Sequence, residues 1–116
     1  IMAKTGRIEQ AAAALTEEAR LAPQLPAPHV NLGDVYAKAG RTEQALEQYQ
    51  IALQLNPSDA DIYHKIGIIH AVTNDMDKAA VFFQCAASIA PQRREYRVDL
   101  ERARDMLRSR VAPQMH

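Results

Sequence analysis

The stretch AKTGRIEQA at residues 3–11 returns as AKAGRTEQA at residues 37–45, an offset of 34 residues. The same step carries Pro23 to Pro57 and then to Pro91. A fixed period of this length is typical of helix-turn-helix units that stack, because each unit buries its apolar face against a neighbour. The self-similarity therefore predicts an all-helical repeat protein.

Within one period, small and apolar residues recur at helical spacing between Pro26 and Pro57, which predicts two amphipathic helices. Gly40 separates them, because glycine readily takes the left-handed conformation that ends a helix. Gly6 and Asn74 occupy the equivalent positions one period away. We therefore expect helices to end at all three positions.

The junction between the two central units carries its own boundary signals. Proline disfavours helical geometry in the residue before it, so the second helix should close at Asn56. Ser58, with Asp61 three residues later, predicts a capping box for the following helix.

The two units share a pattern of small, aromatic and proline residues at matched positions. These positions are Leu32, Gly33, Tyr36, Ala45, Tyr49, Ala52 and Pro57 in the first unit, and Tyr63, Ile66, Gly67, Ala79, Phe83, Ala86 and Pro91 in the second. The pattern resembles that of the tetratricopeptide repeat (TPR). The resemblance implies an α-solenoid of antiparallel helix pairs, wound as a right-handed superhelix, with a C-terminal solvating helix.

In this register one TPR array accounts for the whole chain. Its parts are the second half of a truncated repeat at residues 1–25, complete repeats at 26–59 and 60–93, a capping helix at 94–111 and a frayed tail at 112–116. The register begins within a helix, so we expect the first unit's second helix from about Ile8 to Leu21, and further repeats upstream in a larger protein. Polar outer faces suit a terminal helix.

The resemblance also implies where a partner would bind, since the first helix of each TPR lines a concave groove for peptides or partner helices. The candidates carried over by position are Asn31, Asp34, Lys38, Asp61, His64, Lys65, Ile68 and Val72. The plainer alternative is that these are solvated side chains on a helix surface. Ile68 and Val72 fit that alternative poorly, because apolar residues on a groove face gain free energy when a partner covers them. We therefore expect a protein-interaction scaffold.

One binding device of the family is not expected. The carboxylate clamp for chaperone C-termini needs Lys and Asn on one helix, Asn on the next, and Lys and Arg on a third. Asn31 alone sits at a matching position with the right residue, while Glu95 and Asp99 stand where Lys and Arg are required.

Charge is balanced overall, with fourteen basic and fourteen acidic residues, but seven arginines fall in residues 92–116. Carboxylates lie three or four positions from several of them, which predicts ion pairs within the helix. The predicted pairs are Arg97–Glu101, Asp99–Arg102 and Asp105–Arg108. We therefore expect no nucleic-acid partner.

Neither an enzyme nor a metal or cofactor site is expected. Cys85 is the single cysteine, the four histidines offer no pair on one helix face at metal-ligand spacing, and no Ser-His-acid set or glycine-rich phosphate loop occurs. No apolar run approaches the roughly 20 residues that cross a bilayer, so no membrane insertion is expected. We expect a cytoplasmic protein, although a cysteine-poor periplasmic protein fits the same composition.

Two other functions stay open. The repeats could drive self-assembly into a homo-oligomer, with Ile8, Ala12 and Leu15 exposed on the N-terminal helix and drawing in a second copy. Alternatively, they could be the targeting arm of an enzyme whose catalytic domain lies upstream.

Overall fold

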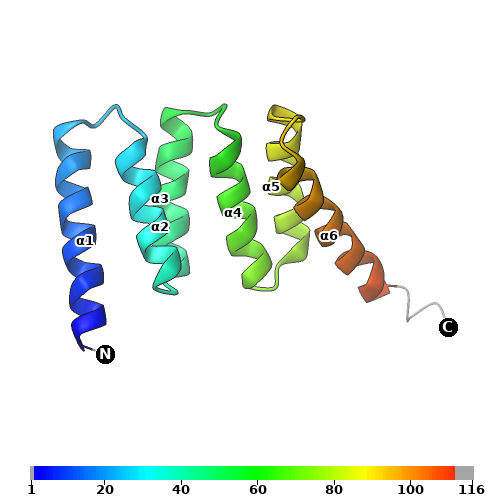
Figure 1. The fold of residues 1–116 in the computed structure, drawn as a ribbon, viewed down its shortest axis with the longest axis horizontal. Coiled ribbons are helices and arrows are strands. Elements are labelled where there is room, and N and C mark those ends of the chain that lie inside the picture. Colours follow the sequence, from blue (N-terminus) through cyan, green and yellow to red (C-terminus); the bar gives the residue numbers. More distant parts are fainter. Residues whose placement is uncertain (1, 112–116) are drawn as a thin grey trace. The chain divides into compact units, whose positions relative to one another are not determined.

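The computed structural model describes residues 2–111, with side chains described for residues 6–110, so the predicted frayed tail at 112–116 lies outside it. The described chain folds into α-helices joined by short turns, as the period predicted (Figure 1). The helices are α1 (Met2–Leu21), α2 (Ala27–Lys38), α3 (Thr42–Leu55), α4 (Ala60–Val72), α5 (Met76–Ile89) and α6 (Arg94–Val111). They form two compact units, unit 1 from Ile1 to Pro57 and unit 2 from Ser58 to His116.

In unit 1, α2 and α3 form an antiparallel pair, and α1 packs on α2. The pair is close because Gly33 has no side chain: a Cβ there would lie 2.3 Å from the Tyr49 ring. Ala45 and Ala52 of α3 are fully buried, so small residues keep this contact thin. The sequence pattern therefore acts here as the resemblance implied.

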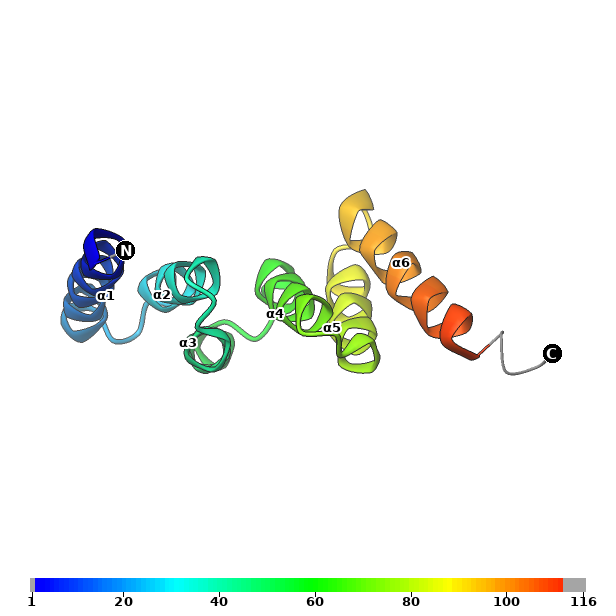
Figure 2. The same ribbon diagram turned by 90° about the horizontal axis from the view of Figure 1, so that it is seen from below.

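Unit 2 repeats this packing with α4 and α5 and adds α6 against α5 (Figure 2). Gly67 faces Phe83, whose ring would lie 2.6 Å from an added Cβ. The unit's core is then extended by the apolar stripe of α6, where Tyr96, Leu100 and Ala103 are buried. Burial of this stripe fixes the capping helix to the last repeat.

Two of the three predicted left-handed turns are confirmed. Gly40 has φ 77° and Asn74 has φ 64°, and each joins the two helices of one repeat. The expectation for Gly6 is wrong, because α1 runs through it without a break. At Gly40 and Asn74 the turned-back chain packs against the helix it leaves, whereas a Cβ at Gly6 would meet no atom within 4 Å.

The predicted capping box at Ser58 is also wrong. The N-cap of α4 is Asp59, whose carboxylate accepts a hydrogen bond from the Asp61 backbone N–H at 3.0 Å. Ser58 lies in the turn before it. An aspartate at the N-cap both accepts this bond and stabilises the positive end of the helix, so it is a good competitor for the position.

The expectation that Ile8, Ala12 and Leu15 are exposed is wrong as well. Ala12 is buried, with 6% of its surface exposed, and Ile8 and Leu15 are half-buried. These residues form the stripe with which α1 packs on α2, since they lie three to four positions apart.

Candidate functional site

Two exposed apolar residues mark the outer face of α4. Ile68 is 41% exposed and Val72 is 75% exposed, four positions apart on one side of the helix. The opposite side carries Ile62, Ile66 and Ile69, which are buried. The apolar surface of α4 is thus wider than its contact with α5 requires.

Beside these residues, an apolar cavity of about 210 Å³ opens between α4 and α6. Its lining comes from the outer face of α4, the first turns of α5 and the second half of α6. The lining residues are Ile68, Ala71, Val72, Met76, Phe83, Asp99, Arg102, Ala103 and Met106. Met106 is itself 50% exposed at the mouth. A cavity of this kind can take an apolar side chain.

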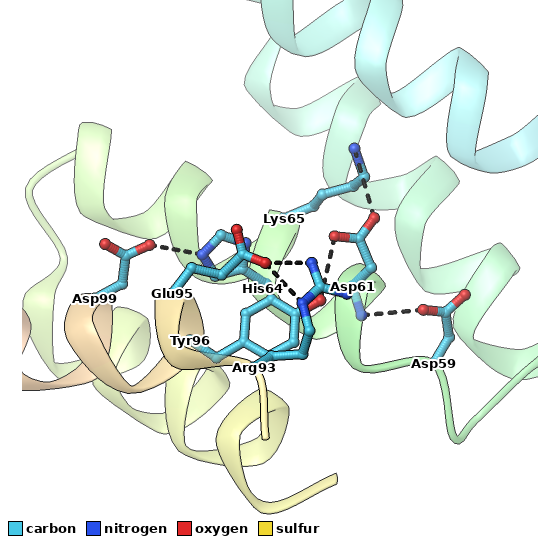
Figure 3. A network of polar contacts seen from close by, with 8 residues as sticks. All are labelled: Asp59, Asp61, His64, Lys65, Arg93, Glu95, Tyr96 and Asp99. Carbon is cyan, nitrogen blue, oxygen red and sulfur yellow. Dashed lines mark hydrogen bonds and ion pairs between the residues drawn. The ribbon is translucent and has the colours of Figure 1, made fainter. Parts of the chain in front are cut away.

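The predicted groove residue His64 fastens the two helices that border the cavity (Figure 3). Its Nε2 lies 2.6 Å from a carboxylate oxygen of Asp99 on α6. The ring also packs against Tyr96 and Phe83, with centroid distances of 4.8 and 5.5 Å. His64 therefore serves the packing of α6 on the repeat.

A second set of polar contacts links the start of α4 to the start of α6. Asp61 pairs with Lys65 at 3.9 Å and accepts a longer hydrogen bond, at 3.5 Å, from the Tyr96 hydroxyl. Burial raises the pKa of Tyr96, and the Asp61 charge raises it further. The Arg93 guanidinium lies over the Tyr96 ring at 4.9 Å and donates to Glu95 at 2.7 Å. These contacts hold Asp61 and Lys65 at the edge of the α4 face (Figure 3).

The remaining predicted groove residues belong to unit 1. Asn31 and Lys38 are exposed on α2. Asp34 is half-buried and accepts a hydrogen bond from the Tyr49 hydroxyl at 2.6 Å, so its carboxylate supports the α2–α3 pair.

The arginine pairing on α6 is partly as predicted. Asp99 pairs with Arg102 at 3.7 Å, and Asp105 pairs with Arg108. The predicted Arg97–Glu101 pair is wrong, because Glu101 pairs with Arg104 at 3.0 Å instead. Within the described residues, neither Arg94 nor Arg97 forms an ion pair.

The other residues considered as chemical candidates have packing contacts. His29 shares a 2.8 Å hydrogen bond with Gln48, and His70 stacks on Phe82 at 5.4 Å. Burial lowers the pKa of His70. Cys85 is a half-buried free thiol. Across the described side chains no group of three or more His, Cys, Asp and Glu residues could hold a metal ion. None of the helices described is long and apolar enough to span a membrane.

Sequence reasoning missed the contribution of α6 to the cavity. Met106 and Arg102 lie 34 residues after Val72 and Ile68. The same period that identified the repeats could therefore have extended the predicted face onto the capping helix.

Comparison with known proteins agrees with this architecture. A family model described as TPR repeat matches residues 33–72. The first TPR of Spaghetti (RPAP3), solved with the HSP90 peptide SRMEEVD, superposes with a TM-score of 0.79 at 19% identity, over 90% of this chain and 82% of that one. A thermophilic TPR protein of Thermus thermophilus, TTC0263, gives 0.78 at 26% identity, over 85% and 50%. MamA gives 0.78 at 23% identity, over 87% and 59%. No curated protein matches the chain.

The antiparallel helix pairs with glycine–aromatic contacts define the chain as a helical repeat protein of the protein-binding kind. The matched family model and the shared fold place it in the tetratricopeptide repeat family. It spans 50% of the Thermus protein and 59% of MamA.

Proposed function

We propose that this chain is a protein-interaction module that binds a peptide or helix of a partner on the face formed by α4 and α6. The observation that carries the proposal is the apolar cavity of about 210 Å³ lined by Ile68, Val72 and Met106. Exposed apolar surface at a concave site is the usual mark of a binding region in a soluble domain. A partner that inserts one apolar side chain there would remove all three residues from water.

Polar groups at the edge of the cavity would orient the partner. Asp61 and Lys65 pair with each other at one end, and Asp99 and Arg102 pair at the other. Because opposite charges alternate along the face, the partner backbone and neutral polar side chains can find donors and acceptors without a strong charge of their own. We therefore expect recognition through an apolar anchor, with polar contacts that set register.

An acidic C-terminal peptide is a poor ligand for this face. The Spaghetti TPR was solved with such a peptide, SRMEEVD. Here Glu95 and Asp99 occupy the α6 positions for which the family's clamp uses Lys and Arg, and Asp99 is already bonded to His64. Like charges would repel the peptide's carboxylates.

The proposal is tested by selection from a displayed library of random peptides against the intact chain. We expect the selected peptides to share an apolar anchor residue and to lose binding to the Val72→Glu and Ile68→Glu variants. Val81→Glu is the matched control, because Val81 is 59% exposed on α5 and lies outside the cavity lining. Peptides that bind the Val72→Glu variant as tightly as the original chain would refute this assignment.

A further inference from the structure

A second surface lies on the other side of α6, between α6 and α5. It is a hollow of about 770 Å³, more than three times the cavity described above. The α6 residues that line it include Arg94, Arg97, Val98, Glu101 and Arg104, and Gln84 and Ala87 contribute from α5. The hollow is open to solvent and therefore requires an explanation different from the binding face on α4.

The 34-residue period shows what kind of element fits there. In α4, the residues that hold α5 are Tyr63 and His70, which stack on Phe82, and His64 and Gly67, which contact Phe83. Their counterparts 34 residues later are Arg97, Arg104, Val98 and Glu101. All four counterparts line the hollow. The hollow is thus the position at which the second helix of a repeat would pack on α6.

An ordinary second helix does not fit this position. Phe83 and Tyr49 each need a glycine opposite them, and α6 has Glu101 there. Phe82 faces two aromatic rings in unit 2, and α6 has two arginines there. A matching helix would need smaller residues in place of the aromatic pair and an acidic residue for the arginines.

The helix α1 has these substitutions in the same register. Ala14 and Leu15 stand where α5 has Phe82 and Phe83, and Glu18 stands where α3 and α5 have the fully buried Ala52 and Ala86. Ala14 and Glu18 are exposed, and Leu21 on the next turn is 68% exposed. This outer face of α1 is not the stripe that packs on α2.

The charges also match. The position of Glu18 is one turn after that of Ala14, toward the helix C-terminus, and the partner helix runs antiparallel. A helix docked like α5 would therefore bring Glu18 to the first turns of α6, where Arg94 and Arg97 lie. Within the described residues, Glu18, Arg94 and Arg97 form no ion pair, so docking would give all three a partner.

We propose that the occupant of the hollow is α1 of a second copy of this chain, which completes on α6 the helix pair of a further repeat. The contact is heterologous, since the α1 face of one copy meets the α6 face of another. It uses a surface separate from the peptide-binding face and does not depend on that function.

The test is sedimentation velocity of the full chain over a range of concentrations, with charge reversals at the two faces. We expect concentration-dependent self-association that weakens about tenfold or more in Glu18→Arg and in Arg97→Glu, because each reversal places like charges together. An equimolar mixture of the two variants should associate again, since Arg at position 18 of one copy then meets Glu at position 97 of the other. Recovery in the mixture also shows that both variants are folded.

Glu47→Arg is the matched control, because Glu47 is an exposed residue of α3 with the same change in charge. The proposal is overturned if the chain stays monomeric at millimolar concentration. It is overturned equally if self-association is the same in Glu18→Arg and Arg97→Glu as in the original chain, or if it is abolished by Val72→Glu instead.

Discussion

The imidazole of His64 and the carboxylate of Asp99 meet at 2.6 Å, although 35 residues separate them in the chain. Only 13% of the His64 side chain and 27% of the Asp99 side chain are exposed. The bond therefore ties the capping helix to the last repeat in a partly shielded environment, directly beside the proposed binding cavity. Changes at this contact should be felt both in stability and in the shape of the cavity.

We predict that Asp99→Ala destabilises the chain by about 1 to 3 kcal/mol, because the His64 N–H loses its acceptor while its ring stays between Tyr96 and Phe83. Urea unfolding followed by far-UV circular dichroism measures the change. Asp105→Ala is the control: its pair with Arg108 is exposed, so about 0.5 kcal/mol or less is expected. Equal losses in the two variants would mean that the His64 contact carries no special weight.

Substituting alanine at two glycines should have opposite effects. Gly67→Ala should cost about 1 to 3 kcal/mol, because the new Cβ would lie 2.6 Å from the buried Phe83 ring. Gly6→Ala should stabilise by roughly 0.5 to 1 kcal/mol, because Gly6 lies within α1 with open space around it. Thermal and urea unfolding of both variants compares them directly. A destabilised Gly6→Ala chain would contradict a continuous α1.

Stability should fall in mild acid, in part through His70. Burial against Phe82 lowers the pKa of His70 below its ordinary value of 6.5, although the Asp75 charge opposes this. The unfolded chain then binds the proton more readily, so this contribution to stability is present above about pH 6.5 and is lost as the pH falls through the folded pKa. Urea midpoints at about pH 7.5 and about pH 5 measure the change.

The matched variant for this effect is His70→Phe, which keeps an aromatic ring on Phe82 but does not titrate. Its urea midpoint should fall less between the two pH values than that of the original chain. An unchanged pH dependence would assign the loss to other groups.

A peptide that ends in a free carboxylate preceded by acidic residues should bind weakly or not at all. Glu95 and Asp99 present negative charge at the α6 positions where such a ligand needs cations. Fluorescence anisotropy with a labelled acidic peptide tests this, and lowering the ionic strength should not improve binding, because the repulsion is then less screened. Micromolar affinity would overturn the argument from these two side chains.

Much of the fold was predictable because it depends on local rules that recur every 34 residues. The turns at Gly40 and Asn74 and the glycine–aromatic contacts follow from single residue types at fixed positions. The errors arose where the local signal was the same but the surroundings differed. Gly6 matches Gly40 in sequence, yet the helix continues through Gly6, and Asp59 takes the cap in place of Ser58.

The candidate site was less predictable for a related reason. The register placed Ile68 and Val72 on an outer face, and both are exposed there. It could not show that His64 turns toward Asp99, or that Met106 and Arg102 approach from α6. Those contacts depend on how the capping helix packs across the repeat, which arises from tertiary packing of its apolar stripe.

The most direct test of the binding face is a methyl NMR titration of the intact chain with a peptide obtained by the library selection. The account predicts that the methyl signals of Ile68, Val72 and Met106 shift together, with one dissociation constant, while that of Val81 stays in place. A peptide that binds tightly while the Ile68, Val72 and Met106 signals do not move would contradict it.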